Sequence, residues 1–368
     1  MNKSETELLT TNELLFTLSG CIIGVGILSL PNSIVANAQQ DGWISTTIGC
    51  LYPLYLILIG GIIIRTYPDK TVMEVSILHF GKLFGNFLNF LFMAQFLLYV
   101  VGVIGSANSI LRVYAVSFMT PFKISLVLVM LIIYACCKGL KTIAKINVLM
   151  FFIIAALTLS STMALKNGSI LNIQPIFGSG LSKIFKSSIE SAFAYGNMEI
   201  LFVIYPFVKN KKPVIRAALV ATCIITFIYT WTVFITTFYL GPDIVPKSLW
   251  PFFFVSDSIQ IPAITNFRFI FMALWTLIIF KTATSQYFAA SAIFNDIFKK
   301  IDRKYVYFLL SPLILVLPLL FTNEVARRDF FTKVMPWVTL FNLIYITLIS
   351  IFTAIKRKKV SKISAGKG

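Results

Sequence analysis

Long blocks of apolar residues, separated by short charged segments, run through almost the whole chain. The blocks do not alternate with polar residues at the period of an amphipathic helix or strand, and each is about as long as a helix that crosses a bilayer. Composition agrees, because 58% of the residues are hydrophobic and 12% are charged, against about 45–50% and ~25% in soluble domains. In lipid each segment must satisfy its own backbone polar groups, so the sequence predicts an all-α polytopic membrane protein.

About ten membrane-spanning helices are expected, in two sets of five. We expect a first five-helix repeat over residues 1–164, a second over 187–355 and a basic tail over 356–368. The candidate spans cover residues 12–34, 43–64, 84–111, 122–137, 145–164, 187–208, 214–240, 268–294, 305–321 and 335–355.

Two short spacings predict helix starts. Thr10 and Glu13 have the Thr-x-x-Glu spacing of a capping box before the first span. Because this segment lacks the basic region of a cleavable signal peptide, we expect the first span to be a retained helix. Ser187 and Glu190 have the corresponding spacing and would cap the outer start of the sixth span.

The net charge of +18 indicates a membrane topology. With a cytoplasmic N-terminus, the inside segments hold 21 of the 32 Lys and Arg residues and the outside loops hold ten. This bias follows the positive-inside rule and predicts that both termini are cytoplasmic. We therefore expect the basic residues to contact anionic lipid headgroups, and we expect no nucleic-acid partner.

Residues suited to catalysis or metal binding are scarce. His79 is the single histidine, which argues against a histidine metal cluster and against a His-based catalytic triad. The five cysteines contain no C-x-x-C pair and lie in apolar spans, at positions 21, 50, 136, 137 and 223. The chain has no phosphate-binding loop motif and no loop long enough for a catalytic domain. We therefore expect neither an enzyme, nor a cofactor, nor a metal site.

Two of the spans contain residues that weaken a helix. The first reads LSGCIIGVGILSLP, with Gly20, Gly24 and Gly26 in its middle, and the sixth reads SAFAYGNMEI, with Gly196 and Asn197. Glycine inside a helix costs about 1 kcal/mol relative to alanine. Close helix packing would explain either span alone. Interruptions at corresponding positions of two five-helix halves instead indicate an inverted-repeat transporter fold.

Broken helices would provide a binding site for a small zwitterion, because their ends carry partial charges of about +0.5 and −0.5. The ligand carboxylate would meet backbone amides in the first span, and its ammonium would meet carbonyls near Ala194 and Tyr195. The residues expected at this site are Gly24, Val25, Gly26, Ile27, Phe193, Ala194, Tyr195, Gly196 and Asn197.

Three motifs carry a resemblance to a known family. They are the run IGVGILSLP in the first span, the segment YPDKT at 67–71 and the AYGNME break in the sixth span. With the size and span number of the whole chain, they resemble the endospore germination permease family. Its members are the B subunits of Ger-type (GerAB-like) nutrient germinant receptors, a branch of the amino acid–polyamine–organocation superfamily. The resemblance implies the leucine-transporter fold, a place in the inner membrane of a bacterial spore, and A and lipoprotein C subunits as partners.

Polar and small residues recur on one face of the third span, at Gln95, Tyr99, Gly102, Ser106 and Ser109. Helix packing explains Gly102 and Ser106, whereas the polar groups of Gln95 and Tyr99 need partners. The family resemblance implies that Tyr99 helps to line the central site.

Two charged residues fall inside expected spans. Glu199 and Lys281 are candidates for coupling or gating, although either could form only a structural pair. In the superfamily the eighth helix commonly forms a sodium site with the first. The resemblance therefore implies that the Lys281 ammonium lies where sodium would sit, with Glu199 or carbonyls of the first span as its partners. The polar residues beside Lys281 are Thr282, Thr284 and Ser285.

The expected function is that of a receptor subunit that binds a small nutrient, an amino acid, in the middle of the membrane and triggers germination. A proton- or sodium-coupled amino-acid permease that uses the same site is the alternative. A scaffold or ion-conducting subunit of a membrane complex is the second alternative.

Overall fold

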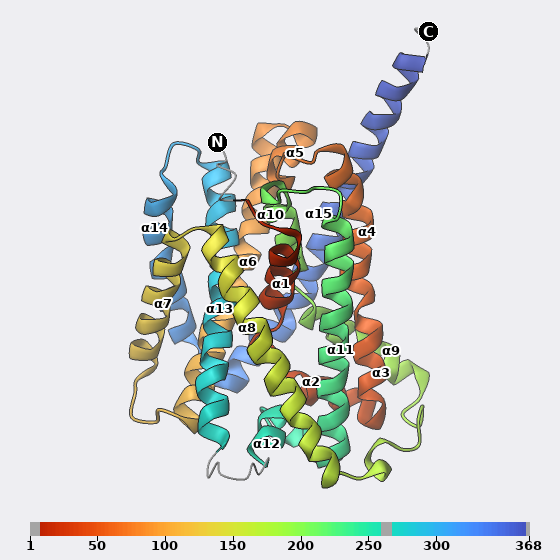
Figure 1. Ribbon diagram of the computed structural model, residues 1–368, viewed down its shortest axis with the longest axis vertical. Helices are drawn as coiled ribbons and strands as arrows, with labels where there is room; N and C mark the ends of the chain where they lie inside the picture. Colours follow the sequence, from red (N-terminus) through yellow and green to blue (C-terminus); the bar gives the residue numbers. More distant parts are fainter. Residues whose placement is uncertain (1–7, 259–266, 366–368) are drawn as a thin grey trace.

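A computed structural model describes residues 8–258 and 267–365, with side chains described as far as residue 357. Every named element of these residues is a helix, and they form one elongated bundle (Figure 1). Seven helical stretches of the described residues are long and apolar enough to cross a membrane by length and composition. The chain is therefore an integral membrane protein with an all-α fold.

Each expected span corresponds to one helix or to a pair of helices. The first and sixth spans are broken, into α1 and α2 and into α9 and α10. The helices are α1 (Thr11–Ile22), α2 (Gly26–Ala38), α3 (Gly42–Gly49), α4 (Leu51–Thr66), α6 (Lys82–Tyr114), α7 (Pro121–Cys137), α8 (Leu140–Ser160), α9 (Leu181–Ala194), α10 (Leu201–Ile204), α11 (Val214–Leu240), α13 (Phe267–Ile297), α14 (Arg303–Val316) and α15 (Glu324–Ala365). Two further short helices, α5 (Val72–Phe80) and α12 (Pro251–Asp257), lie between spans.

The two breaks have different local causes. The first helix stops at Ile22, and Ile23 has an extended backbone before α2 begins at Gly26. In the second break Asn197 has a left-handed backbone with φ of 80°, a conformation that asparagine tolerates better than most residues. Gly196 lies directly against the Tyr99 hydroxyl, where an added Cβ would collide with it.

One of the two predicted helix caps is confirmed. Thr10 and Glu13 form the expected capping box at the start of α1. The cap predicted at Ser187 and Glu190 is wrong, because Gly180 allows the chain to turn at a positive φ of 88° and α9 then begins at Leu181. Ser187 Oγ donates to the carbonyl of Ile34, and Glu190 accepts from the Asn37 amide at 3.1 Å, so both join α9 to α2.

The first helix begins and the last helix ends at the same end of the bundle (Figure 1). At this end Leu9 and Val208 form a β-bridge, and Lys141 pairs with Glu13 at 2.6 Å. The bridge ties the start of the first broken helix to the end of the second. The basic tail expected at 356–368 is helical as far as Ala365 and projects beyond the bundle, while 366–368 lie outside the described residues.

Candidate ligand-binding site

A cavity of about 150 Å³ lies between the two helix breaks. Its walls come from the first break and from α6, α9, α11, α13 and α15. Seven of the ten predicted ligand-binding residues line it, namely Gly24, Val25, Gly26, Tyr99, Phe193, Ala194 and Asn197. The site predicted between the two broken helices therefore corresponds to a cavity.

The other three predicted residues lie behind the cavity wall. Ile27 is buried, and its amide donates to the carbonyl of Gly24 at 3.4 Å. Tyr195 points away, because its hydroxyl donates to the carbonyl of Thr46 at 2.9 Å. Gly196 lies against the hydroxyl of Tyr99, which itself lines the cavity.

Three residues of the first break that line the cavity have backbone amides without a hydrogen-bond partner among the described residues. Within residues 8–258 and 267–365, no hydrogen bond engages the amides of Gly24, Val25 and Gly26. These amides lie at the N-terminal end of α2, where the helix dipole favours negative charge. They suit a carboxylate.

The carbonyls at the end of α1 are already hydrogen-bonded by side chains. The carbonyl of Cys21 accepts from Gln286 Nε2 at 3.3 Å, and that of Ile22 accepts from the Tyr229 hydroxyl at 2.9 Å. The Tyr229 hydroxyl also lies 3.4 Å from the carbonyl of Ala194. The sequence predicts that this carbonyl binds the ligand ammonium.

Two side-chain oxygens supply the acceptors instead. Asn197 Oδ1 and Gln286 Oε1 are buried, belong to residues that line the cavity, and have no hydrogen-bond partner in the part of the chain that the structure describes. The orientation of Gln286 follows from its contact with Cys21, because a carbonyl can accept only from the amide nitrogen. The cavity thus offers donors for a carboxylate and acceptors for an ammonium.

The side chain of Lys281, from α13, contacts the backbone at the C-terminal end of α1. This side chain is 0% exposed, and its Nζ donates to the carbonyl of Gly20 and, at 2.6 Å, to that of Ile23. The Thr282 hydroxyl lies 3.2 and 3.1 Å from the same two carbonyls. The partners of Lys281 are therefore carbonyls of the first span, one of the two possibilities that the sequence raised.

Ser285 and Thr284 have different surroundings. Ser285 Oγ donates to the carbonyl of Lys281 and accepts from Asn147 at 3.0 Å. It therefore links the turn of α13 that carries Lys281 to α8. Thr284 donates to the carbonyl of Phe280, and its own carbonyl accepts from Cys136 on α7. The backbone of Thr284 therefore contacts α7.

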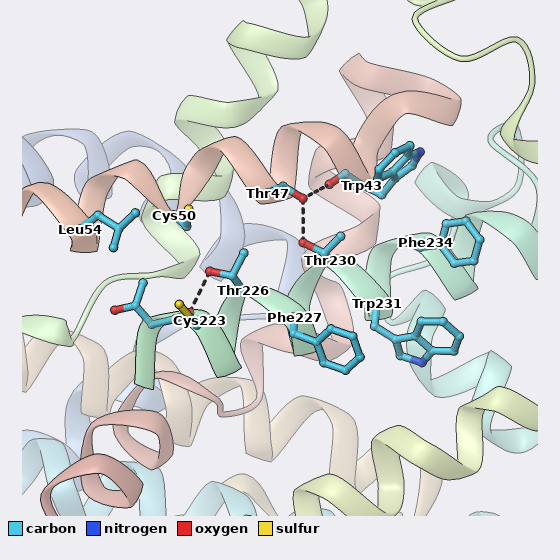
Figure 2. A pocket seen from close by; sticks show the side chains of 11 residues that line it. Trp43, Thr47, Cys50, Leu54, Cys223, Thr226, Phe227, Thr230, Trp231 and Phe234 are labelled. Atoms are coloured by element: carbon cyan, nitrogen blue, oxygen red, sulfur yellow. Dashed lines mark hydrogen bonds between the residues drawn. The ribbon is translucent and has the colours of Figure 1, made fainter. Parts of the chain in front are cut away.

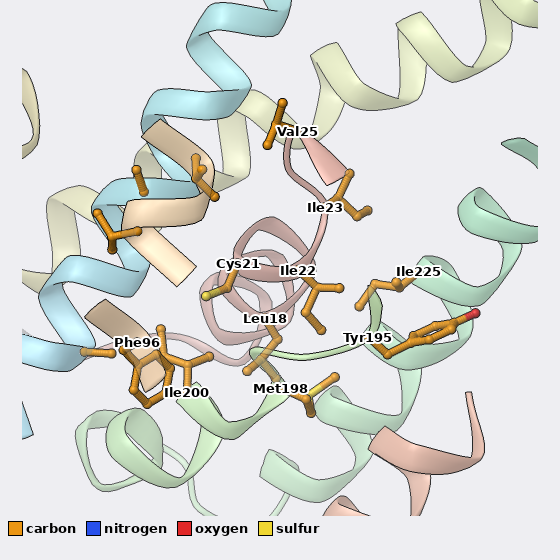
Figure 3. Close-up of a cluster of buried hydrophobic side chains, with 14 of the residues drawn as sticks. Leu18, Cys21, Ile22, Ile23, Val25, Phe96, Tyr195, Met198, Ile200 and Ile225 are labelled. Carbon is orange, nitrogen blue, oxygen red and sulfur yellow. The ribbon is translucent and has the colours of Figure 1, made fainter. Parts of the chain in front are cut away.

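Glu199 lies on the other side of the first break and is not a partner of Lys281. Its Oε1 accepts from the Tyr52 hydroxyl and, at 2.7 Å, from the Asn342 amide, which also donates to Gln95 at 2.6 Å. Gln95 thus has the polar partner that the sequence required. Figure 3 shows the apolar side chains around this region, among them Leu18 of α1.

Arg327, on α15, forms another part of the cavity wall. Its guanidinium binds Glu324 at 2.9 and 2.5 Å and stacks on Phe331. Arg327 also lines a second cavity of about 700 Å³, beyond the central one. Nearby, Arg328 donates to Asn32 at 3.3 Å, which joins α15 to α2.

A third hollow, of about 570 Å³, lies between α3, α4 and α11 (Figure 2). Its walls are apolar or carry threonines, and Thr47 and Thr230 share a hydrogen bond of 2.9 Å across it. None of the predicted site residues lines it. Despite the larger volume of this groove, none of its described lining residues carries a charge that would orient a zwitterion.

Sequence reasoning missed six residues of the cavity, namely Ile22, Val103, Tyr229, Gln286, Arg327 and Phe331. Gln286 follows Thr282 by one helical turn and therefore shares its face, which is a usable signal. Arg327 gave none, because hydropathy alone places it in an outside loop.

The broken helices and the cavity between them define a polytopic protein with a transporter-like fold. Two solved structures share this fold. MhsT in complex with L-phenylalanine aligns with a TM-score of 0.66 and 15% identity over 95% of this chain and 89% of MhsT. A Na⁺-coupled sialic acid symporter aligns with a TM-score of 0.62 and 13% identity over 92% of this chain and 79% of the symporter. The chain therefore has the leucine-transporter fold, as the resemblance implied.

The chain belongs to the spore germination protein family, which matches residues 8–329. Spore germination protein YndE of Bacillus subtilis (strain 168) is 26% identical over 87% of this chain and 89% of the relative. Spore germination protein GerQB of Bacillus cereus is 22% identical over 88% of each chain. Spore germination protein B2 of Bacillus subtilis (strain 168) is 24% identical over 81% and 82%. The predicted family is confirmed.

Proposed function

We propose that this chain is the ligand-binding subunit of a spore germinant receptor and that a small amino acid binds in its central cavity. The observation that carries the proposal is a pair of binding features: the amides of Gly24–Gly26 and the side-chain oxygens of Asn197 and Gln286 all lack hydrogen-bond partners among the described residues. A zwitterion satisfies both sets, because its carboxylate accepts and its ammonium donates.

The remaining walls suit a small side chain. Val103, Phe193 and Phe331 provide apolar surface, and the volume of about 150 Å³ limits the size of the ligand. The binding groups belong to both broken helices, so an amino acid would join them. Such a ligand shifts the protein toward the arrangement in which both sets of contacts form.

The proposal includes a setting for the chain. It would lie in the inner membrane of a bacterial spore with both termini cytoplasmic, in contact with A and C subunits and with membrane lipids. The division into repeats at 1–164 and 187–355 remains a prediction.

Lys281 supports a further part of this proposal. Its ammonium donates to the carbonyls of Gly20 and Ile23, which would be ligands of a cation bound between α1 and α13. We therefore expect the protein to work without sodium.

Deletion of the gene from a spore-former tests the receptor role. Germination with one nutrient class should be lost, whereas uptake of that nutrient by vegetative cells should stay normal. Normal germination with every nutrient would contradict the proposal.

An amino-acid permease is the second candidate, because the fold is shared with a symporter and Arg327 lines both the central and the larger cavity. Loss of vegetative uptake in the same deletion strain would favour this candidate. Uptake of radiolabelled L-alanine by vesicles that contain the purified chain would measure it directly.

A further inference from the structure

Glu199 is a buried carboxyl group without a counter-ion in the part of the chain that the structure describes. Its side chain is 0% exposed, and the ion pairs of the described residues do not include it. Both of its hydrogen bonds from other side chains, from Tyr52 and Asn342, reach Oε1. Its Oε2 has no partner within residues 8–258 and 267–365. One half of the carboxyl group is therefore satisfied and the other half is not.

The titratable groups that face Glu199 are ordinarily neutral. They are Cys21 from α1, Tyr52 from α4 and Tyr99 from α6. Lys281 lies beyond Cys21 and is held by the carbonyls of α1. From α15, the neighbouring group is the neutral amide of Asn342. An ionised carboxylate at this position would thus be desolvated without an opposite charge beside it, which is strongly unfavourable.

A proton on Oε2 would remove both the uncompensated charge and the unmet hydrogen bond of that oxygen. It removes the charge and converts an oxygen without a partner into a donor. A buried acceptor that lacks a donor among the described residues belongs to a neighbour of Glu199, namely Asn342 Oδ1. The surroundings therefore match a carboxylic acid better than a carboxylate.

Buried polar side chains continue from Glu199 along the seam between α6 and α15. Asn342 donates to Gln95, and one turn further along α15 the Tyr345 hydroxyl donates to Asn89 at 2.7 Å. Asn89 in turn donates to the carbonyl of Met73 in α5 at 3.2 Å. All of these side chains are buried.

The polar seam reaches the end of the bundle where α1 begins. The hydroxyls of Ser76 and Ser350 are buried beside it without partners in the described part of the chain. Beyond them, His79 and Thr353 share a hydrogen bond of 3.0 Å. Buried hydroxyls with unmet hydrogen bonds are sites where water is retained inside proteins, so these groups can link the side chains into a continuous path.

We propose that Glu199 is a proton-binding site, and that the polar seam of Gln95, Asn342, Tyr345, Asn89 and Ser76 connects it to water at the end of the bundle where α1 begins. A proton delivered from hydronium forms an O–H bond at Oε2, which converts the carboxylate to a carboxylic acid and leaves a water molecule. Release breaks that O–H bond and returns the proton to water by the same path. Neither Glu199 nor a residue of this seam lines the ligand cavity, so the proton site can be tested without a bound ligand.

Infrared difference spectroscopy on the full chain in lipid nanodiscs tests the proton site. The carbonyl-stretch band of a protonated carboxylic acid should be present at neutral pH and disappear in Glu199→Gln, which keeps the shape of the side chain. Glu13→Gln is the control, because Glu13 is an ion-paired carboxylate and its removal should leave the band. A band that persists in Glu199→Gln, or that is absent from the unmodified protein, would overturn the proposal.

The path is tested by the rate at which the same band shifts after transfer to D₂O. Gln95→Met and Asn89→Leu keep the side-chain volume but remove polar atoms from the seam, and each should slow the shift by an order of magnitude or more. Asn108→Leu, in the outer half of α6 next to Ser125, is the control and should leave the rate unchanged. Unchanged exchange in both seam variants would show that protons reach Glu199 by another route.

Discussion

At the scale of single residues, Gln286 and Asn197 provide the acceptors for the ammonium group of the proposed ligand. Replacing Gln286 with Met removes one acceptor at nearly constant volume. A hydrogen bond to a charged group is worth about 1.5–3 kcal/mol, so we expect the dissociation constant for L-alanine to rise roughly 10- to 150-fold. Calorimetric titration of the purified chain measures this change.

Ser291→Ala provides the matched control for that titration. Ser291 also lies on α13 and is buried with an unpartnered oxygen among the described residues, but it does not line the cavity. Its removal should leave the dissociation constant unchanged. Equal losses in both variants would indicate a general effect on α13 instead of a ligand contact.

Lys281 governs the dependence on sodium. In Lys281→Gln the carbonyls of Gly20 and Ile23 lose their ammonium partner and become available to a cation. The thermal unfolding temperature of the unmodified protein should not change when choline replaces sodium, whereas that of the variant should fall. The response to germinant across pH and sodium concentration gives a second readout. If that response is the same in variant and unmodified protein under all conditions, Lys281 is only structural.

At the scale of elements, the second break depends on the contact between Gly196 and Tyr99. Gly196→Ala places a methyl group against the Tyr99 hydroxyl, and such overpacking costs about 1–3 kcal/mol of unfolding free energy. Tyr99→Phe removes that hydroxyl and should restore part of the loss in the double variant. Denaturant unfolding measures both effects.

Gly26→Ala is the comparison for this break. An added Cβ at Gly26 meets no atom within 4 Å, so its unfolding free energy should stay within about 0.5 kcal/mol of the unmodified protein. A loss at Gly26 as large as that at Gly196 would argue against a steric cause.

The packing of α5 against α15 should depend on pH through His79. Its ring stacks on Phe352 and bonds to Thr353, and burial lowers the pKa of the imidazole, with Lys356 adding to the effect. Folding therefore favours the neutral ring. Stability is kept above the ordinary imidazole pKa of about 6.5 and is lost as the pH falls below it.

Thermal unfolding of the unmodified protein and of His79→Gln, each followed from about pH 8 to about pH 5, checks this prediction. The decrease in unfolding temperature below pH 6.5 should be smaller in the variant. Parallel curves for the two proteins would rule out His79 as the source.

The helices themselves could be predicted because each span must satisfy its backbone hydrogen bonds internally, which leaves a continuous hydropathy signal. The start of α9 could not, since it depends on the backbone angle at Gly180. Gln286 and Arg327 were missed for a different reason. Their roles arise from contacts with α1 and with the second cavity, between segments that lie far apart in the sequence.

At the scale of the whole molecule, Glu199 and Lys281 belong to separate networks on the two sides of α1. The sequence left open that they form a pair. Because they share no hydrogen-bond partner among the described residues, the unfolding free energies lost in Glu199→Gln and Lys281→Gln should add within about 0.5 kcal/mol in the double variant. An interaction energy of about 1 kcal/mol or more would reveal direct coupling.

The bridge between Leu9 and Val208 constrains how the molecule can move. Two backbone hydrogen bonds of 2.8 Å, from Leu9 to Phe207 and from Lys209 to Leu9, join the starting segment of the chain to the end of the second broken helix. Pulling these strands apart would leave backbone groups unpaired, at a cost of about 1–3 kcal/mol each. The two broken helices are therefore joined at the end of the bundle where α1 begins, and a force applied to either one displaces both together.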